Sequence, residues 1–285
     1  METKRKPRAV PQADVGPADG GVRTGTQSIE RVVGMLRVVA SRGRRGMRIA
    51  DVVDVSGLPM STCFRMLQRL ELEGLVVRDA MTRKYHLGPL LYELGLLAQP
   101  RYRLADLCEQ AMQTIADETQ DTVYLSERRG VESICTSRVL GDYPIKALTL
   151  DVGIRRPMGV GAGGLAILSA LPELEVAQVV ECNDARYAKF GTFEPGFVHR
   201  AVAETRAQGY AFLDSAATPG TAAVGVAFPP ENPTAAISVA AISSRLGPAR
   251  RAQVAKVIQK QVRIICAQLS SAATASPTSP RRARG

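Results

Sequence analysis

The segment from Leu58 to Leu70 shows the pattern that most restricts what this chain can fold into. At the period of an α-helix, about 3.6 residues, its apolar side chains fall on one side and its polar side chains on the other. Pro59 suits the first turn, where a missing N–H loses no partner. The segment therefore predicts a helix that buries one face and exposes a polar, basic one. The apolar side consists of Cys63, Met66, Leu67 and Leu70, and the polar side of Ser61, Thr62, Arg65, Gln68 and Arg69.

The polar side of this helix has the chemistry of a DNA-reading surface. Hydroxyl groups near a helix N-terminus, with guanidinium groups behind them, are suited to contact base edges and phosphates in the major groove. Many amphipathic surface helices have the same pattern without binding DNA. The flanking sequence therefore has to distinguish the two interpretations.

Two shorter helices are predicted before this segment and a β-hairpin after it. Ser28 is expected to cap the first helix, which ends at residues 42–46, and the second stops at Ser56-Gly57. Beyond Gly74, two short strands would form a wing whose basic side chains meet phosphates. This order of elements is the winged helix-turn-helix arrangement. The wing strands are residues 75–79 and 83–87, and their basic residues are Arg78, Arg83 and Lys84.

The positive charge of the chain is unevenly distributed. The formal net charge is +10, yet residues 89–270 hold 18 basic and 18 acidic residues. Residues 26–88 hold 11 basic and 6 acidic residues, and the two ends supply the remaining excess. A charged segment is often only a solvated face, but a basic domain joined to a neutral one is typical of a protein that binds DNA.

Composition argues against several classes of protein. No apolar run approaches the roughly 20 residues of a membrane span, and the N-terminus lacks the apolar core of a signal peptide, so we expect a cytoplasmic protein without a membrane partner. The five cysteines are scattered and form no C-x-x-C pair, which fits a reducing compartment. With only His86 and His199, the chain has little material for a metal site or a Ser-His-Asp triad. We expect no cofactor and no enzymatic activity.

Residues 90–97 are too apolar for a solvated linker. A helix that is apolar around most of its circumference needs a cover, and the same helix of a second subunit is the nearest candidate. Dimerisation would also suit a helix-turn-helix protein, because two recognition helices read two half-sites.

The remainder of the chain, from about residue 104, has a mixed α/β pattern. Strands near both of its ends indicate one antiparallel or mixed sheet flanked by helices. The expected strands are residues 122–128, 131–138, 145–150, 210–213, 222–228 and 234–242, and the expected helices are 104–119, 164–170, 172–181, 198–208 and 249–269.

Several blocks, in this order and spacing, resemble the IclR family of bacterial transcription regulators. In the first half they are Ser28-Ile29-Glu30-Arg31, the Gly57–Leu67 segment, Glu73–Val76 and Tyr85–Gly88. In the second half they are Arg156–Ala166, Gly209–Ala211, Pro219–Val226 and Ala236–Val239. The resemblance covers about residues 26–270 and implies an α+β protein. Its expected regions are a disordered basic tail at 1–25, a winged helix-turn-helix domain at 26–88, a linker helix at 89–104, a GAF-like α/β effector-binding domain at 105–270 and a second disordered basic tail at 271–285.

The resemblance also implies partners and site residues. The partners are a double-stranded DNA operator, a small-molecule effector and further copies of the chain, as a homodimer or homotetramer. By family position, Ser61, Thr62, Phe64 and Arg65 would contact DNA, and we add Arg48, Arg69, Arg83 and Lys84. The implied effector site takes Gly161, Ala162, Gly163, Asp214, Thr221, Ala222, Ala223 and Ser238.

Three positions depart from the family's usual residues. Met60 stands where many members have Lys or Arg, so one phosphate contact is expected to be absent. Ala222 and Ala223 stand where many members have Arg and Cys. We therefore expect a ligand that is larger, or less dependent on a charge clamp, than a two- or three-carbon keto acid. An aromatic or medium-sized organic acid, with its carboxylate held by Ser238 and backbone N–H groups, fits this expectation.

Two other functions remain as alternatives. Residues 159–164 satisfy the G-x-G-x-x-G string of nucleotide-binding enzymes, but the preceding residues 153–158 contain two arginines and a proline instead of a buried apolar strand. The other alternative is a DNA-binding protein whose C-terminal domain only forms oligomers.

Overall fold

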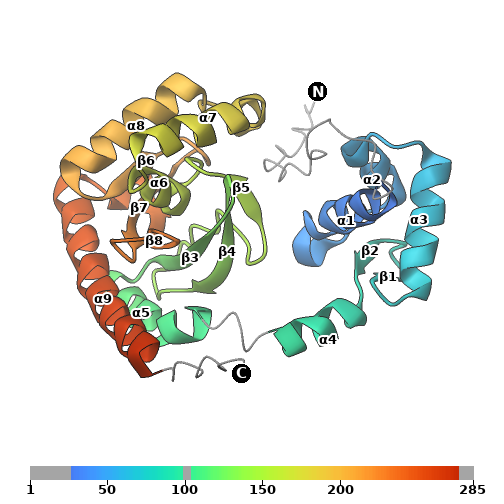
Figure 1. The fold of residues 1–285 in the computed structure, drawn as a ribbon, viewed down its shortest axis with the longest axis horizontal. Helices are drawn as coiled ribbons and strands as arrows, with labels where there is room; N and C mark the ends of the chain where they lie inside the picture. Colours follow the sequence, from blue (N-terminus) through green and yellow to red (C-terminus); the bar gives the residue numbers. More distant parts are fainter. Residues whose placement is uncertain (1–26, 99–103, 276–285) are drawn as a thin grey trace, which may run out of the picture.

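The computed structural model describes residues 27–98 and 104–275, which form two lobes joined through helix α4 (Figure 1). The predicted tail at 1–25 and residues 276–285 of the second tail lie outside the described residues. The first lobe is built from α1 (Gln27–Ala40), the 3-10 turn η1 (Gly43–Arg45), α2 (Ile49–Ser56), α3 (Met60–Leu72), β1 (Val76–Arg78) and β2 (Tyr85–Leu87).

The helices of the first lobe share one small core. Val39 of α1, Val52 of α2 and Leu67 of α3 are buried in it together with Cys63, as the helical pattern of the sequence predicts. Gly57 ends α2 in the left-handed conformation at φ 66°, which lets the chain turn directly into α3. Helix α1 begins at Gln27, so Ser28 lies inside the helix and the prediction that it is the N-cap was wrong.

The wing contains a turn that the sequence did not reveal. Strands β1 and β2 pair antiparallel, with Val76 opposite Leu87. The Asp79 Oδ1 atom accepts hydrogen bonds from the backbone N–H groups of Met81 and Thr82, at 3.1 and 2.6 Å, and these bonds hold the pKa of Asp79 below its ordinary value. Arg83 then takes a positive φ of 60°. A side-chain carboxylate thus supplies the turn that glycine or proline usually provides.

Helix α4 (Pro89–Ala98) leaves the first lobe with none of its residues buried in the monomer. Tyr92 is 70% exposed and Leu97 is 81% exposed. Its start is fixed by Gly88, whose N–H donates to the Leu75 carbonyl at 2.9 Å and where an added Cβ would overlap the Gly74 carbonyl. The described part of the predicted linker is therefore an exposed apolar helix whose N-terminus is held in place by the contacts of Gly88.

The second lobe is a six-stranded antiparallel sheet with helices on both faces (Figure 1). The strand order is β5-β4-β3-β8-β7-β6, so strands from the two ends of the lobe pair at its centre, β3 with β8. Its strands are β3 (Thr122–Arg129), β4 (Glu132–Val139), β5 (Arg155–Pro157), β6 (Ala211–Asp214), β7 (Thr221–Phe228) and β8 (Ala235–Ile242). Its helical elements are α5 (Leu104–Thr119), α6 (Ala162–Ser169), α7 (Glu173–Tyr187), η3 (Ala188–Phe190), α8 (Pro195–Gln208), η4 (Ser243–Arg245) and α9 (Pro248–Ala275).

The two faces of the sheet belong to different cores. Val123, Val224 and Val239 pack with α5 and α9 on one face. Helices α6, α7 and α8 form a second core on the other side, where Ala236 of β8 joins them. Side chains alternate between these faces along each strand. Consequently Tyr124, Ser126 and Ser238 are expected on the face that α6 covers.

Three expectations for the second lobe were wrong. Residues 145–150 form no strand: the hydrogen bonds of this segment run locally, as from Thr149 N–H to the Ala147 carbonyl. The edge of β4 is taken instead by β5, a short strand that its two arginines and proline had concealed. Helix α9 extends to Ala275, into the segment predicted as a disordered tail at 271–285.

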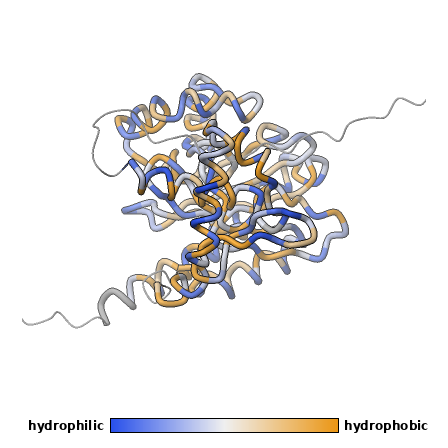
Figure 2. Tube along the Cα trace, turned by 90° about the vertical axis from the view of Figure 1, so that its right-hand side faces the viewer, coloured by the Kyte–Doolittle hydropathy of each residue, from blue (hydrophilic) through white to orange (hydrophobic). Residues whose placement is uncertain are grey.

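Hydrophobic and hydrophilic residues alternate at short intervals along the chain (Figure 2). Within residues 27–98 and 104–275, no helix has both the length and the apolarity needed to cross a membrane.

The origin of α4 gives a test of the fold. We expect Gly88→Ala to destabilise the first lobe by about 1–3 kcal/mol, because the new methyl group must displace the backbone at Gly74. Gly95→Ala is the matched control, since an added Cβ there has no neighbour within 4 Å and should stabilise α4 by roughly 0.5–1 kcal/mol. Thermal unfolding followed by circular dichroism measures both variants. Equal melting curves for the two would contradict the packing described here.

Candidate functional site

The outward face of α3 brings together most of the predicted DNA-contacting residues. Ser61, Phe64 and Arg65 are exposed and Thr62 is half-buried, while Cys63 and Leu67 face the core. The helix follows Pro59, whose carbonyl accepts the Thr62 N–H at 2.9 Å. The surface therefore presents hydroxyls and one aromatic ring within the first two turns of an exposed helix.

The two arginines of α3 differ in their partners. Arg69 donates to the carboxylate of Glu73 one turn further along. Arg65 makes no ion pair within residues 27–98 and 104–275, so its guanidinium is available to an external anion. It also lines a groove between α1 and α3, together with Thr62 and Arg31. Sequence reasoning missed Arg31, although its place in the first turns of a helix packed beside α3 was a usable signal.

The other predicted basic residues lie on the wing and at the start of α2. Arg83 is exposed at the wing turn, while Lys84 Nζ donates to the Arg45 carbonyl at 3.1 Å. Arg48 is exposed at the N-cap of α2. Arg78 lies over the ring of Tyr85, 5.5 Å from its centroid, which braces the hairpin. Two basic residues of the wing, Arg78 and Lys84, therefore make contacts that hold its shape. Arg83 makes no such contact among the described residues.

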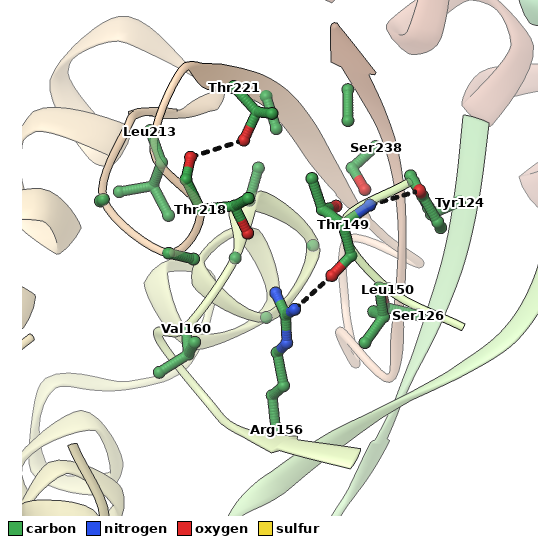
Figure 3. Close-up of a pocket in the computed structure, with 18 of the residues that line it drawn as sticks. Tyr124, Ser126, Thr149, Leu150, Arg156, Val160, Leu213, Thr218, Thr221 and Ser238 are labelled. Atoms are coloured by element: carbon green, nitrogen blue, oxygen red, sulfur yellow. Dashed lines mark hydrogen bonds between the residues drawn. The ribbon is translucent and has the colours of Figure 1, made fainter. Parts of the chain in front are cut away.

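A cavity of ≈ 590 Å³ of empty space, counted to its open mouth, lies in the second lobe between the sheet and the start of α6 (Figure 3). Its floor comes from Tyr124 and Ser126 of β3 and from Ser238 and Ala240 of β8.

Helix α6 lies close to the sheet because glycines face the strands. Gly161 precedes the helix at φ 86° and turns the chain into it. A Cβ on Gly163 would lie 2.6 Å from Ser126 Oγ, and one on Gly225 of β7 would overlap the Ala162 carbonyl. The first N–H groups of α6 have no acceptor within the helix, so they present partial positive charge at the cavity.

Arg156 of β5 contributes the charge of the cavity. It is the only charged side chain among the described residues that line it, and its Nη2 donates to the Thr149 carbonyl (Figure 3). Burial lowers the pKa of its guanidinium from the ordinary value. Sequence reasoning missed this residue, because Arg156 lies in a strand that was not recognised.

The segment between β4 and β5 forms a wall of the cavity and is held by Tyr124. The Tyr124 hydroxyl donates to the Ala147 carbonyl at 2.7 Å and accepts the Thr149 N–H at 3.2 Å. Burial raises the pKa of Tyr124. Thr149 and Leu150 are thereby fixed beside Arg156.

Seven of the eight predicted effector residues line the cavity, and one does not. The seven are Gly161, Ala162, Gly163, Thr221, Ala222, Ala223 and Ser238. The side chain of Ala222 also packs in the core on the opposite face of the sheet, because residues alternate along β7. Asp214 does not line the cavity. It is exposed at the end of β6, where its carboxylate accepts hydrogen bonds from Ser215 and Ser243 at 3.0 and 2.6 Å. The preceding Leu213 points into the cavity instead.

The topology argues against a dinucleotide-binding enzyme. The glycine-rich segment before α6 follows β5, an edge strand that pairs antiparallel with β4. A dinucleotide fingerprint requires parallel strands joined by a crossover helix. The glycines instead allow close packing of α6 and open the cavity.

Two buried thiols are poor nucleophiles. Burial raises the pKa of Cys108 and of Cys135 to about 12, so both are protonated at neutral pH. Cys63, predicted to be a core side chain, is fully buried. Cys182 is exposed on α7.

Sequence profiles of two families match the chain. Residues 28–80 match the IclR helix-turn-helix domain, and residues 99–267 match the bacterial transcriptional regulator IclR C-terminal domain. The transcriptional regulator KipR of Bacillus subtilis is 28% identical over 202 residues, which cover 70% of this chain and 80% of KipR. The transcriptional repressor AllR of Klebsiella pneumoniae is 24% identical over 260 residues, 89% of this chain and 94% of AllR.

Solved structures show the same fold. An IclR transcriptional regulator from Alicyclobacillus acidocaldarius superimposes with a TM-score of 0.68 at 23% identity, covering 84% of this chain and 97% of that one. An IclR homologue from Microbacterium hydrocarbonoxydans, solved in complex with 4-hydroxybenzoate, has a TM-score of 0.66 at 20% identity. The match covers 85% of this chain and 98% of that one. These matches confirm the predicted fold class, α+β with a helix-turn-helix domain and a C-terminal α/β domain.

The chain belongs to the IclR family, and it is a DNA-binding transcriptional regulator of that type. The regulators that it resembles are not enzymes.

The burial of the thiols predicts their reactivity. With a disulfide exchange reagent at mildly alkaline pH, we expect Cys182 to react quickly, whereas Cys108 and Cys135 react only after unfolding, because their pKa lies well above the pH. Absorbance of the released thiol measures both phases. Cys182→Ser should remove the fast phase, and an unchanged fast phase in that variant would contradict the assignment.

Proposed function

We propose that this regulator binds its operator as a homodimer through α3 and the wing, and that a small organic acid in the cavity of the second lobe changes its affinity for that DNA. The observation that carries the proposal is Arg65 on the exposed polar face of α3: it makes no ion pair with any residue that the structure describes, and it lies within a segment of 11 basic and 6 acidic residues.

The side chains of the DNA-binding lobe divide into two roles. Ser61, Thr62 and Arg65 would contact base edges, with Phe64 packing against thymine methyl or sugar groups. The basic side chains around them would neutralise phosphates and fix the position of the lobe on the duplex. These phosphate-binding residues are Arg48, Arg69, Arg83, Lys84 and, from the groove beside α3, Arg31.

Dimerisation is supported by the exposure of α4. Tyr92, Leu94 and Leu97 are largely exposed in the monomer, and a second copy of the same helix would remove them from water. Two DNA-binding lobes would then read two half-sites of one operator. Pairing of dimers into tetramers is a further step of the same proposal.

The ligand role of the second lobe is supported by its cavity. The lining combines apolar side chains with a few polar groups, as small-molecule sites do. The structural neighbour from Microbacterium hydrocarbonoxydans was solved with an organic acid, 4-hydroxybenzoate. The competing proposal, that this lobe only forms oligomers, provides no reason for a cavity lined by an arginine.

Removal of Arg65 tests the DNA-binding assignment. We expect Arg65→Ala to lose specific binding to an operator selected from random duplexes, because a bidentate arginine contributes about 1–3 kcal/mol of discrimination. Gel-shift titration against operator and random DNA measures the loss, and sedimentation checks that the dimer persists.

Two comparison variants sharpen this experiment. Arg83→Ala should weaken binding to every sequence and lower the salt slope by about one, as a phosphate contact does. Arg263→Ala removes the same charge from an exposed position on α9 and should leave DNA binding unchanged. Wild-type operator affinity in Arg65→Ala would refute the role of α3.

A further inference from the structure

The cavity holds a positive charge without a counter-ion. Arg156 has five N–H donors, and the only acceptor found for them among the described residues is the Thr149 carbonyl. None of the described residues that line the cavity carries a carboxylate. A partly buried cation without an anion is unfavourable, and a bound anion removes this penalty. Burial lowers the pKa of Arg156, which shows that its charge is partly removed from water.

The guanidinium and the start of α6 favour an anion at the same place. A Cβ on Gly161 would lie 3.7 Å from Arg156 Nη1, so the guanidinium lies beside the first turn of α6. Figure 3 shows it pointing into the ring of residues that line the cavity. Helix N-termini bind anions through free N–H groups. Two independent features therefore converge on one negatively charged group.

Three serine hydroxyls in the cavity lack partners. Ser126, Ser133 and Ser238 are 4%, 6% and 6% exposed, all three line the cavity, and none makes a hydrogen bond within the described part of the chain. Their hydroxyl oxygens are not among the fully buried, unpartnered atoms of the described residues, so they open onto the cavity. A ligand in the cavity can therefore bring an oxygen or N–H group within hydrogen-bond distance of them.

The glycines of α6 lie directly over these hydroxyls. A Cβ on Gly163 would approach Ser126 Oγ to 2.6 Å and Ser238 Oγ to 3.5 Å, and one on Gly164 would approach Ser133 Oγ to 2.9 Å. Any larger residue would press on the serines or cover them. The glycine-rich string thus keeps the hydroxyls open beside the anion position.

We propose that the cavity selects a singly charged carboxylate with a second, uncharged oxygen function, such as a hydroxy acid or an oxo acid, and that Arg156 binds its carboxylate while the serine cluster, Ser126, Ser133 and Ser238, binds the second function. This inference rests on the proposed function only in taking the cavity as the effector site. It replaces the expectation of a ligand with little dependence on charge.

The residues that line the cavity disfavour three related classes of organic acid. A dicarboxylate would bring a second negative charge, and Arg156 is the only cation among the described lining residues. The ammonium of an amino acid would find no carboxylate among the same residues. An acid with a purely apolar body would leave the serine cluster without partners.

The test uses the full-length protein and matched probes in an aromatic and an aliphatic series. The probes are 4-hydroxybenzoate and 3-hydroxybutyrate, each compared with its amide and with the acid that lacks the hydroxyl, benzoate or butyrate. Thermal shift and calorimetric titration measure binding. At least one hydroxy acid should stabilise the wild type, its amide should not, and the acid without the hydroxyl should bind several-fold more weakly.

Two arginine variants locate the charge. Arg156→Met should lower the affinity for the hydroxy acid roughly 10- to 100-fold, as expected when a charged hydrogen-bonding partner is lost. Arg155→Met is the matched control, because Arg155 is the adjacent arginine of β5 and its Nη1 binds Glu132 at 3.1 Å. It should leave the affinity unchanged. Ser126→Ala should remove the preference for the hydroxy acid while the affinity for benzoate or butyrate stays the same.

Three results would overturn the inference: no acid of either series stabilises the wild type, an amide binds as tightly as its acid, or Arg156→Met retains wild-type affinity. Operator binding measured on the same samples tests the proposed regulatory function separately from the inference about ligand selection. A regulator whose DNA affinity responds only to a neutral compound refutes the charge selection alone. Binding of a hydroxy acid through Arg156 without any effect on operator affinity supports the selection and refutes the regulatory role.

Discussion

The second lobe depends on the close approach of α6 to the sheet. All eight residues of α6 are buried, and the helix begins so near β7 that a Cβ on Gly225 would overlap the Ala162 carbonyl. This contact holds the first N–H groups of the helix over the sheet, where Tyr124, Ser126 and Ser238 lie on the facing side. The cavity is the space left between the start of the helix and these strands. Glycine at a few positions therefore determines both the packing and the ligand site.

The division of the chain into lobes separates two kinds of chemistry. The first lobe has a small core, and its outward helix face and wing expose basic side chains. The second lobe contains ion pairs, such as those of Glu132 with Arg155 and Arg186, whereas Arg156 has no carboxylate partner among the described residues. Helix α4 lies between them with exposed apolar residues. Its exposure is why we assign the contact between copies to this element.

The sequence was most informative where one periodic pattern determines one element. The buried face of α3, the turn at Gly57 and a single sheet with strands from both ends of the second lobe followed from apolar period and glycine position. Arg156 was missed because β5 has no apolar pattern: it is a strand only because β4 has a free edge. Asp214 was misplaced because the alternation at the end of β6 depends on where pairing with β7 stops. Such features depend on contacts between distant segments, which no local pattern encodes.

The central claim is that occupancy of the cavity and binding of the operator are coupled. Coupling is reciprocal, so a ligand that changes operator affinity must have its own affinity changed by the operator, by the same factor. The direct measurement is a pair of titrations: labelled operator with and without saturating hydroxy acid, and hydroxy acid with and without saturating operator. We expect both affinities to change by one common factor, about 5- to 150-fold. An operator affinity that stays constant while the cavity is saturated would contradict the claim.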